Sequence, residues 1–78
     1  MPKEEPKTEV RRLGDRIVYE LSTPGIKGKE DIMINRLEEG LEILAISKEK
    51  VYQKKLPLKL EVIDYSVSDG SLTIEFKA

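Results

Sequence analysis

Apolar residues recur at every second position along most of this chain, and this alternation limits the folds that it can adopt. The clearest run ends the sequence, where Leu72, Ile74 and Phe76 alternate with polar residues between Ser71 and Lys77. A period of two places the apolar side chains of a strand on one face and the polar ones on the other. The pattern therefore predicts strands with one buried side and one side facing water.

Short clusters of turn-forming residues separate the alternating runs. They are Gly14-Asp15, Thr23-Pro24-Gly25, Glu38-Glu39-Gly40, Leu56-Pro57 and Ser68-Asp69-Gly70. Glycine, proline, asparagine and aspartate mark turns because they suit the backbone angles that turns require. The spacing predicts seven strands, at about 9–13, 15–22, 31–37, 41–47, 50–56, 61–67 and 71–77. This is an all-β pattern, and it indicates an immunoglobulin-like antiparallel β-sandwich.

One stretch admits a second interpretation. Residues 35–50 fit a helix, because Leu37, Leu41 and Leu44 would share one helical face. Gly40 would then lie inside the helix at a cost of about 1 kcal/mol, so we favour a strand. In that strand both Leu44 and Ile46 point away from the predicted core side. They either contact a second layer or form an exposed apolar patch.

The length allows one small domain. The chain has 78 residues with a net charge of -1, and a chain this short holds a single hydrophobic core. Residues 1–8 contain no apolar residue after the initiator methionine, which predicts a mobile N-terminal arm. The folded domain is expected to cover residues 9–78.

Composition argues against an enzyme and against bound cofactors. The sequence has no cysteine, histidine or tryptophan, which removes thiolate nucleophiles, Cys/His zinc sites and the commonest general base. The acidic pairs Glu30-Asp31 and Glu38-Glu39 lie in predicted turns, and the carboxylates Asp64, Asp69 and Glu75 lack the spacing of a calcium-binding loop. We expect no catalytic site, no cofactor and no metal.

The charge pattern gives little support to a nucleic-acid or membrane partner. Tyr52 lies among the basic residues of the chain, which would suit a single-stranded nucleic-acid groove, but acidic residues alternate with them. No run approaches the ~20 apolar residues of a membrane span, and no signal peptide is visible, so we expect a cytoplasmic protein. The Glu and Lys bias, with few amides, is typical of proteins from thermophiles.

Four motifs, in order, resemble the α-crystallin domain of the small heat-shock proteins. The first runs from Glu20 through Thr23-Pro24-Gly25 to Glu30-Asp31-Ile32, as in the family's Leu-Pro-Gly turn and Glu-Asp-Ile sequence. The other three are Leu41-Glu42-Ile43-Leu44-Ala45, Gln53-Lys54-Lys55-Leu56-Pro57 and Asp69-Gly70-Ser71-Leu72-Thr73-Ile74. The resemblance covers about Arg12 to Lys77 and implies the α-crystallin type of sandwich.

Departures from the family pattern matter for assembly. Many members have a long loop whose strand crosses to a partner, but only about Ser47 to Val51 separates the corresponding strands here. An Ile-x-Ile tail is also not seen after the last strand. The sequence in this respect is similar to the compact domain appended to arsenical-pump-type ATPases. The resemblance therefore implies a monomer or weak dimer and not a large shell.

The resemblance implies two protein-binding functions. The first is an ATP-independent chaperone of the stress response, which binds apolar segments of unfolded or partly folded proteins. The second is a co-chaperone or docking module that binds one specific folded partner, such as an ATPase. The family's apolar groove corresponds to Leu41, Ile43, Ala45, Val62 and Ile63, although the same five residues also fit a plain hydrophobic core.

Overall fold

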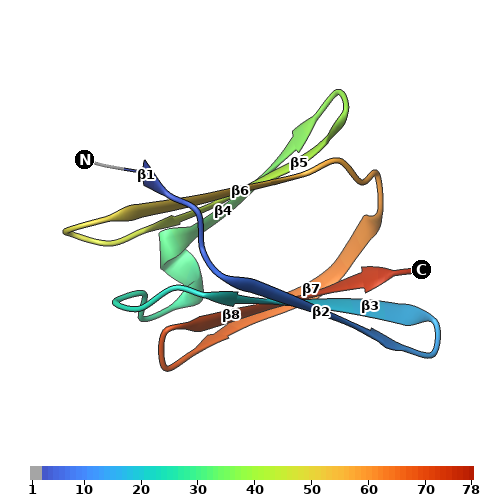
Figure 1. Ribbon diagram of the computed structural model, residues 1–78, viewed down its shortest axis with the longest axis horizontal. Helices are drawn as coiled ribbons and strands as arrows, with labels where there is room; N and C mark the ends of the chain where they lie inside the picture. Colours follow the sequence, from blue (N-terminus) through green and yellow to red (C-terminus); the bar gives the residue numbers. More distant parts are fainter. Residues whose placement is uncertain (1–2) are drawn as a thin grey trace.

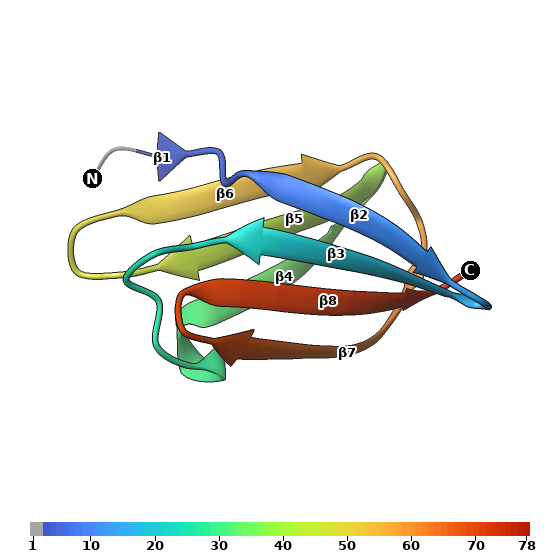
Figure 2. The same cartoon turned by 60° about the horizontal axis from the view of Figure 1, so that its bottom comes forward.

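Two four-stranded sheets pack face to face in the computed structural model, which describes residues 3–78 (Figure 1). The first sheet has the strand order β1 (Lys3–Glu4), β6 (Val51–Leu56), β5 (Gly40–Ile46) and β4 (Ile32–Leu37). The second has the order β2 (Thr8–Leu13), β3 (Arg16–Ser22), β8 (Ser71–Lys77) and β7 (Glu61–Ser68) (Figure 2). Neighbouring strands are antiparallel except β1 and β6, which are parallel.

The predicted all-β sandwich is confirmed. Each of the seven predicted strands is present, with ends that differ from the prediction by at most one residue. The helical alternative for residues 35–50 is wrong, because these residues form the end of β4, all of β5 and the turn into β6. A short 3-10 turn, η1 (Lys29–Asp31), precedes β4.

The core lies between the sheets and comes from the alternating positions of both. In β8 the side chains of Leu72, Ile74 and Phe76 are fully buried, as the alternation predicts. Tyr19 of β3 packs edge-on against Phe76, with ring centroids 5.4 Å apart. The remaining buried members of the cluster are Leu21, Ile26, Ile32, Leu41, Ile43, Ala45, Tyr52 and Leu56.

The loop after β3 is fastened to the turn between β7 and β8. Asp69 and Gly70 both have positive φ angles, 47° and 73°, which suits the tight hairpin that an Asp-Gly pair predicts. The carbonyl oxygen of Gly70 accepts hydrogen bonds from the backbone N–H of Thr23 at 2.7 Å and from its hydroxyl at 3.3 Å. Thr23 is fully buried, so these bonds satisfy its polar groups.

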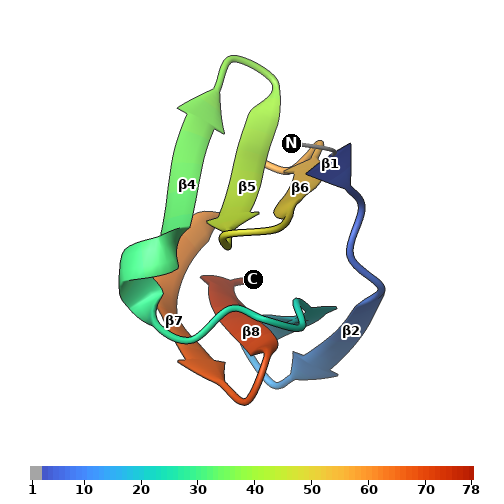
Figure 3. The ribbon, with the colours of Figure 1, turned by 90° about the vertical axis from the view of Figure 1, so that its left-hand side faces the viewer.

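The N-terminal segment crosses from one sheet to the other along one side of the sandwich (Figure 3). We call residues 3–7 the strap. Its first two residues pair with β6, Pro6 is buried, and the Lys7 carbonyl accepts a hydrogen bond from the Ser22 N–H at 2.9 Å. The mobility expected for an arm over residues 1–8 stays a prediction, and residues 1–2 lie outside the described part of the chain. Pairing with an exposed strand edge needs no apolar side chains, so hydrophobicity did not reveal it.

Candidate protein-binding surface

Two strand edges lie open on the side of the sandwich opposite the strap. β4 ends the first sheet and β7 ends the second, and Figure 3 shows both at the same side of the molecule. An edge strand presents unpaired backbone N–H and C=O groups, to which an extended chain can add as a further strand. We call this side the β4–β7 edge.

Apolar side chains line this edge. Ile32 and Ile34 of β4 face the core, Ile32 buried and Ile34 half-buried. From β7, half-buried Val62, Tyr65 and Val67 pack against the same core cluster. A partner strand at this edge would therefore find both backbone hydrogen-bonding groups and partly accessible apolar surface.

The predicted groove residues fall into two groups. Leu41, Ile43 and Ala45 lie on β5, an inner strand, and each is only 1% exposed. Val62 packs against their cluster, whereas Ile63 is 37% exposed. The structure thus brings four of the five residues into one core cluster and leaves Ile63 at the surface. Their role in binding a partner stays a prediction.

A β-bulge accounts for the exposure of Ile63. The pairing of β7 with β8 shifts between Val62, which faces Phe76, and Asp64, which faces Glu75, so Ile63 is an extra residue. Bulges of this kind are common at sheet edges, where they re-aim a side chain. The sequence carries no turn residue there, so the prediction of an unbroken strand missed it.

The 3-10 turn closes one end of the β4–β7 edge. The Lys29 ammonium lies 3.9 Å from the Asp64 carboxylate and 4.6 Å from the centre of the Tyr65 ring. These contacts join η1 to β7 across the gap between the sheets. Because Lys29 and Asp64 are both largely exposed, their ion pair contributes little to stability.

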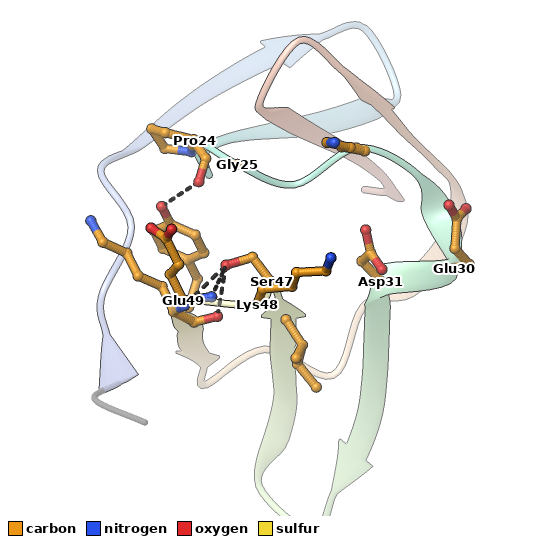
Figure 4. A pocket seen from close by; sticks show the side chains of 11 residues that line it. Pro24, Gly25, Glu30, Asp31, Ser47, Lys48 and Glu49 are labelled. Atoms are coloured by element: carbon orange, nitrogen blue, oxygen red, sulfur yellow. Dashed lines mark hydrogen bonds between the residues drawn. The ribbon is translucent and has the colours of Figure 1, made fainter.

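A hollow of about 780 Å³ opens at the end of the sandwich beside the turn between β5 and β6 (Figure 4). Its lining includes three lysines, three acidic residues, Pro24, Ile46 and Tyr52. The Tyr52 hydroxyl donates a hydrogen bond of 2.6 Å to the Pro24 carbonyl, which ties the loop after β3 to β6. The mixed charge of the lining selects no class of ligand.

The other candidate sites do not assemble. Within residues 3–78, no group of three acidic side chains comes together in a way that could hold a metal ion. Glu38 and Glu39 are exposed in the turn between β4 and β5. Tyr52 is 1% exposed, so its ring offers no stacking platform for a nucleotide base. In the described part of the chain, no helix is long and apolar enough to cross a membrane.

The architecture is the α-crystallin type of sandwich found in the small heat-shock proteins. Heat shock protein 16.0 from Schizosaccharomyces pombe is similar with a TM-score of 0.74 and 16% identity, over 96% of this chain and 67% of that one. A mutant of hsp14.1 from Sulfolobus solfataricus P2 has a TM-score of 0.71 and 17% identity, over 95% and 72%. HSP18.5 from E. histolytica has a TM-score of 0.69 and 13% identity, over 95% and 88%.

No protein-family model matches the sequence, and no curated protein matches it. The likeness to the three solved structures, at identities below one fifth, is a likeness of fold. It confirms the type of sandwich that the four motifs predict. Function is a separate question, because one fold serves several functions.

Proposed function

We propose that this domain is a non-enzymatic, ATP-independent chaperone that binds apolar segments of unfolding proteins at the β4–β7 edge. The observation that carries the proposal is the pair of unpaired strand edges on one side, with half-buried apolar side chains between them. The similarity in fold to small heat-shock proteins supports it. An extended client segment would add to β4 or β7 through backbone hydrogen bonds.

In this proposal the predicted groove residues have two different roles. Ile63 and Val62 contact the client from β7, because they are the accessible members of the set. Leu41, Ile43 and Ala45 form the floor that keeps β4 and β7 in place. An acidic substitution at Ile43 would therefore unfold the domain, and only a surface substitution can test client binding.

Light scattering from a heat-labile client protein, warmed with and without the domain at equal molar amounts, tests the proposal. We expect suppressed scattering, and we expect Ile63→Asp to remove most of the suppression, because a charge in the edge opposes an apolar client. Leu13→Asp is the matched control, because Leu13 is 57% exposed on β2, away from this edge. Circular dichroism shows whether each variant is folded. If the wild-type domain is folded but does not suppress the scattering of the client, the proposal is contradicted.

A docking module for one folded partner is the second candidate. The turn between β5 and β6 spans only residues 47–50, so these strands leave no long loop to exchange with another copy. A domain that does not assemble through such a loop is suited to binding a different protein. Unchanged client scattering together with capture of one folded partner, for example an ATPase, would favour this function.

A further inference from the structure

The outer face of the first sheet carries an apolar cluster that the core does not use. Met33 on β4 lies directly across from Leu44 on β5, and Ile46 on β5 lies across from Val51 on β6. Leu44 and Ile46 are two residues apart, so the four side chains form one continuous surface, which we call the outer patch. Met33 is 49% exposed, Ile46 is 37% exposed, and the other two are half-buried. The sequence left open whether Leu44 and Ile46 contact a second layer; among residues 3–78 no further layer of strands covers this face.

The acidic residue beside the outer patch is already engaged within the sheet. The Glu42 carboxylate accepts hydrogen bonds from the Gln53 amide at 2.6 Å and from the Asn35 amide at 3.2 Å. These two bonds lower the pKa of Glu42, with the Gln53 bond contributing most. The amide donors on the two oxygens hold this carboxylate in place within the sheet.

Two basic residues on this face make no close ion pair within the described part of the chain. Lys3 lies beside Val51, and Lys55 lies beside Glu42 in the strand register. Both positive charges also help to lower the pKa of Glu42. Within residues 3–78, no carboxylate oxygen lies within 4.0 Å of either ammonium group. Lys50 and Lys54, by contrast, pair with acidic residues of the strap. The rim of the outer patch thus carries two ammonium groups near the Glu42 carboxylate, neither of them in direct contact with an acid.

We propose that the outer patch binds a short segment of a partner protein in which apolar side chains alternate with or are flanked by carboxylates. The apolar side chains would cover Met33, Leu44, Ile46 and Val51, and the carboxylates would pair with Lys3 and Lys55. Charge complementarity of this kind selects among partners and accelerates their encounter. Met33 lies on β4 but alternates with Ile32 and Ile34, which face the core, so this inference does not rest on the proposed chaperone function.

The size of the patch argues against a second copy of this chain as the occupant. A stable interface buries about 800 Å² on each partner, from roughly 20 residues or more. Four apolar side chains, two of them half-buried, supply only a small part of that area. Two copies would also bring their unpaired lysines together, and like charges in contact are unfavourable.

Binding of two fluorescein-labelled synthetic peptides tests the inference by anisotropy. One has leucines separated and flanked by glutamates, and the other has lysine at every glutamate position. We expect the acidic peptide to bind and the basic one to bind at least about tenfold more weakly. Raising the salt concentration should weaken the acidic complex, because its ion pairs are exposed to solvent.

Variants locate the complex on the outer face. The double change Met33→Gln with Leu44→Gln should raise the Kd of the acidic peptide about tenfold, and Lys3→Glu with Lys55→Glu should reduce the preference for it. Leu13→Gln, on the other sheet, should leave the Kd within about twofold. Ile63→Asp should also leave it unchanged, which separates this site from the β4–β7 edge. Circular dichroism verifies folding throughout.

Three results would overturn the inference. The first is equal affinity for the two peptides, which would indicate non-specific apolar adhesion. The second is binding that the Met33 and Leu44 changes do not weaken in folded protein. The third is a dimer in sedimentation velocity that these changes abolish, which would assign the patch to a second copy of the chain.

Discussion

At the scale of single residues, Tyr52 has an unusual position because its ring is buried while its hydroxyl reaches across to the other sheet. The ring is 1% exposed, and the hydroxyl donates a 2.6 Å hydrogen bond to the Pro24 carbonyl in the loop after β3. We predict that Tyr52→Phe lowers the free energy of unfolding by about 1 kcal/mol, because a buried hydrogen bond is lost without a change in packing. Urea unfolding followed by circular dichroism measures this change.

Tyr19→Phe is the matched control for that prediction. Tyr19 packs against Phe76, but within residues 3–78 its hydroxyl makes no hydrogen bond to the protein. Its removal should change the stability by about 0.5 kcal/mol or less. Equal losses in the two variants would show that the hydroxyl of Tyr52 contributes nothing specific.

Residue alternation predicted which side chains are buried but not which are accessible to a partner. Leu41, Ile43 and Ala45 follow the same period of two as Leu72, Ile74 and Phe76, and all six are buried. Whether a strand lies inside a sheet or at its edge depends on pairing between segments that are far apart in the sequence. A local residue pattern carries no information on that pairing. The predicted groove therefore included three residues of an inner strand, β5, and it omitted Ile32 and Ile34 of an edge strand, β4.

At the scale of elements, the strap is the least securely attached part of the described fold. It pairs with β6 through only two residues, and its ion pairs, Glu4 with Lys50 and Glu5 with Lys54, each at 3.3 Å, lie largely at the surface. Exposed ion pairs are each worth at most about 1 kcal/mol. We predict that deleting residues 1–5 lowers the free energy of unfolding by less than about 2 kcal/mol and speeds amide hydrogen exchange in β6.

Hydrogen exchange in β8 is the internal control for the deletion. β8 lies inside the second sheet and does not touch the strap strand, so its amides should keep their protection. A similar increase in exchange in both strands would mean that the strap stabilises the whole domain and not one edge.

The strands at 50–56 and 71–77 were predicted from the sequence, and the structure contains both. β1 has two charged residues and no apolar pattern, so it left no signal in the sequence.

At the scale of the whole molecule, the fold was predictable because many local signals agree with one another. Alternating runs, Asp-Gly and Pro-Gly turns and a short length all favour one sandwich with one core. The features that decide binding are of a different kind. The bulge at Ile63, the uncovered outer face and the strap on β6 all depend on how the strands are arranged in three dimensions.

The same arrangement predicts that the chain is a monomer in solution. The turn between β5 and β6 is closed by a 2.9 Å hydrogen bond from the Ser47 N–H to the Lys50 carbonyl, and the Ser47 hydroxyl accepts one of 3.0 Å from the Lys50 N–H. Such a turn leaves no strand free for exchange with another copy, and the strap covers part of the β6 edge.

We therefore expect one species of about 9 kDa in sedimentation velocity and a radius of gyration close to 12 Å in solution scattering, since the Cα trace has 11.9 Å. Leu13 and Val10 are exposed on the β2 edge, which is the most open place for a second chain to pair. A stable dimer that persists on dilution would contradict the prediction. Its loss in Leu13→Lys would then assign the contact to β2, because a charge on an edge strand opposes pairing between sheets.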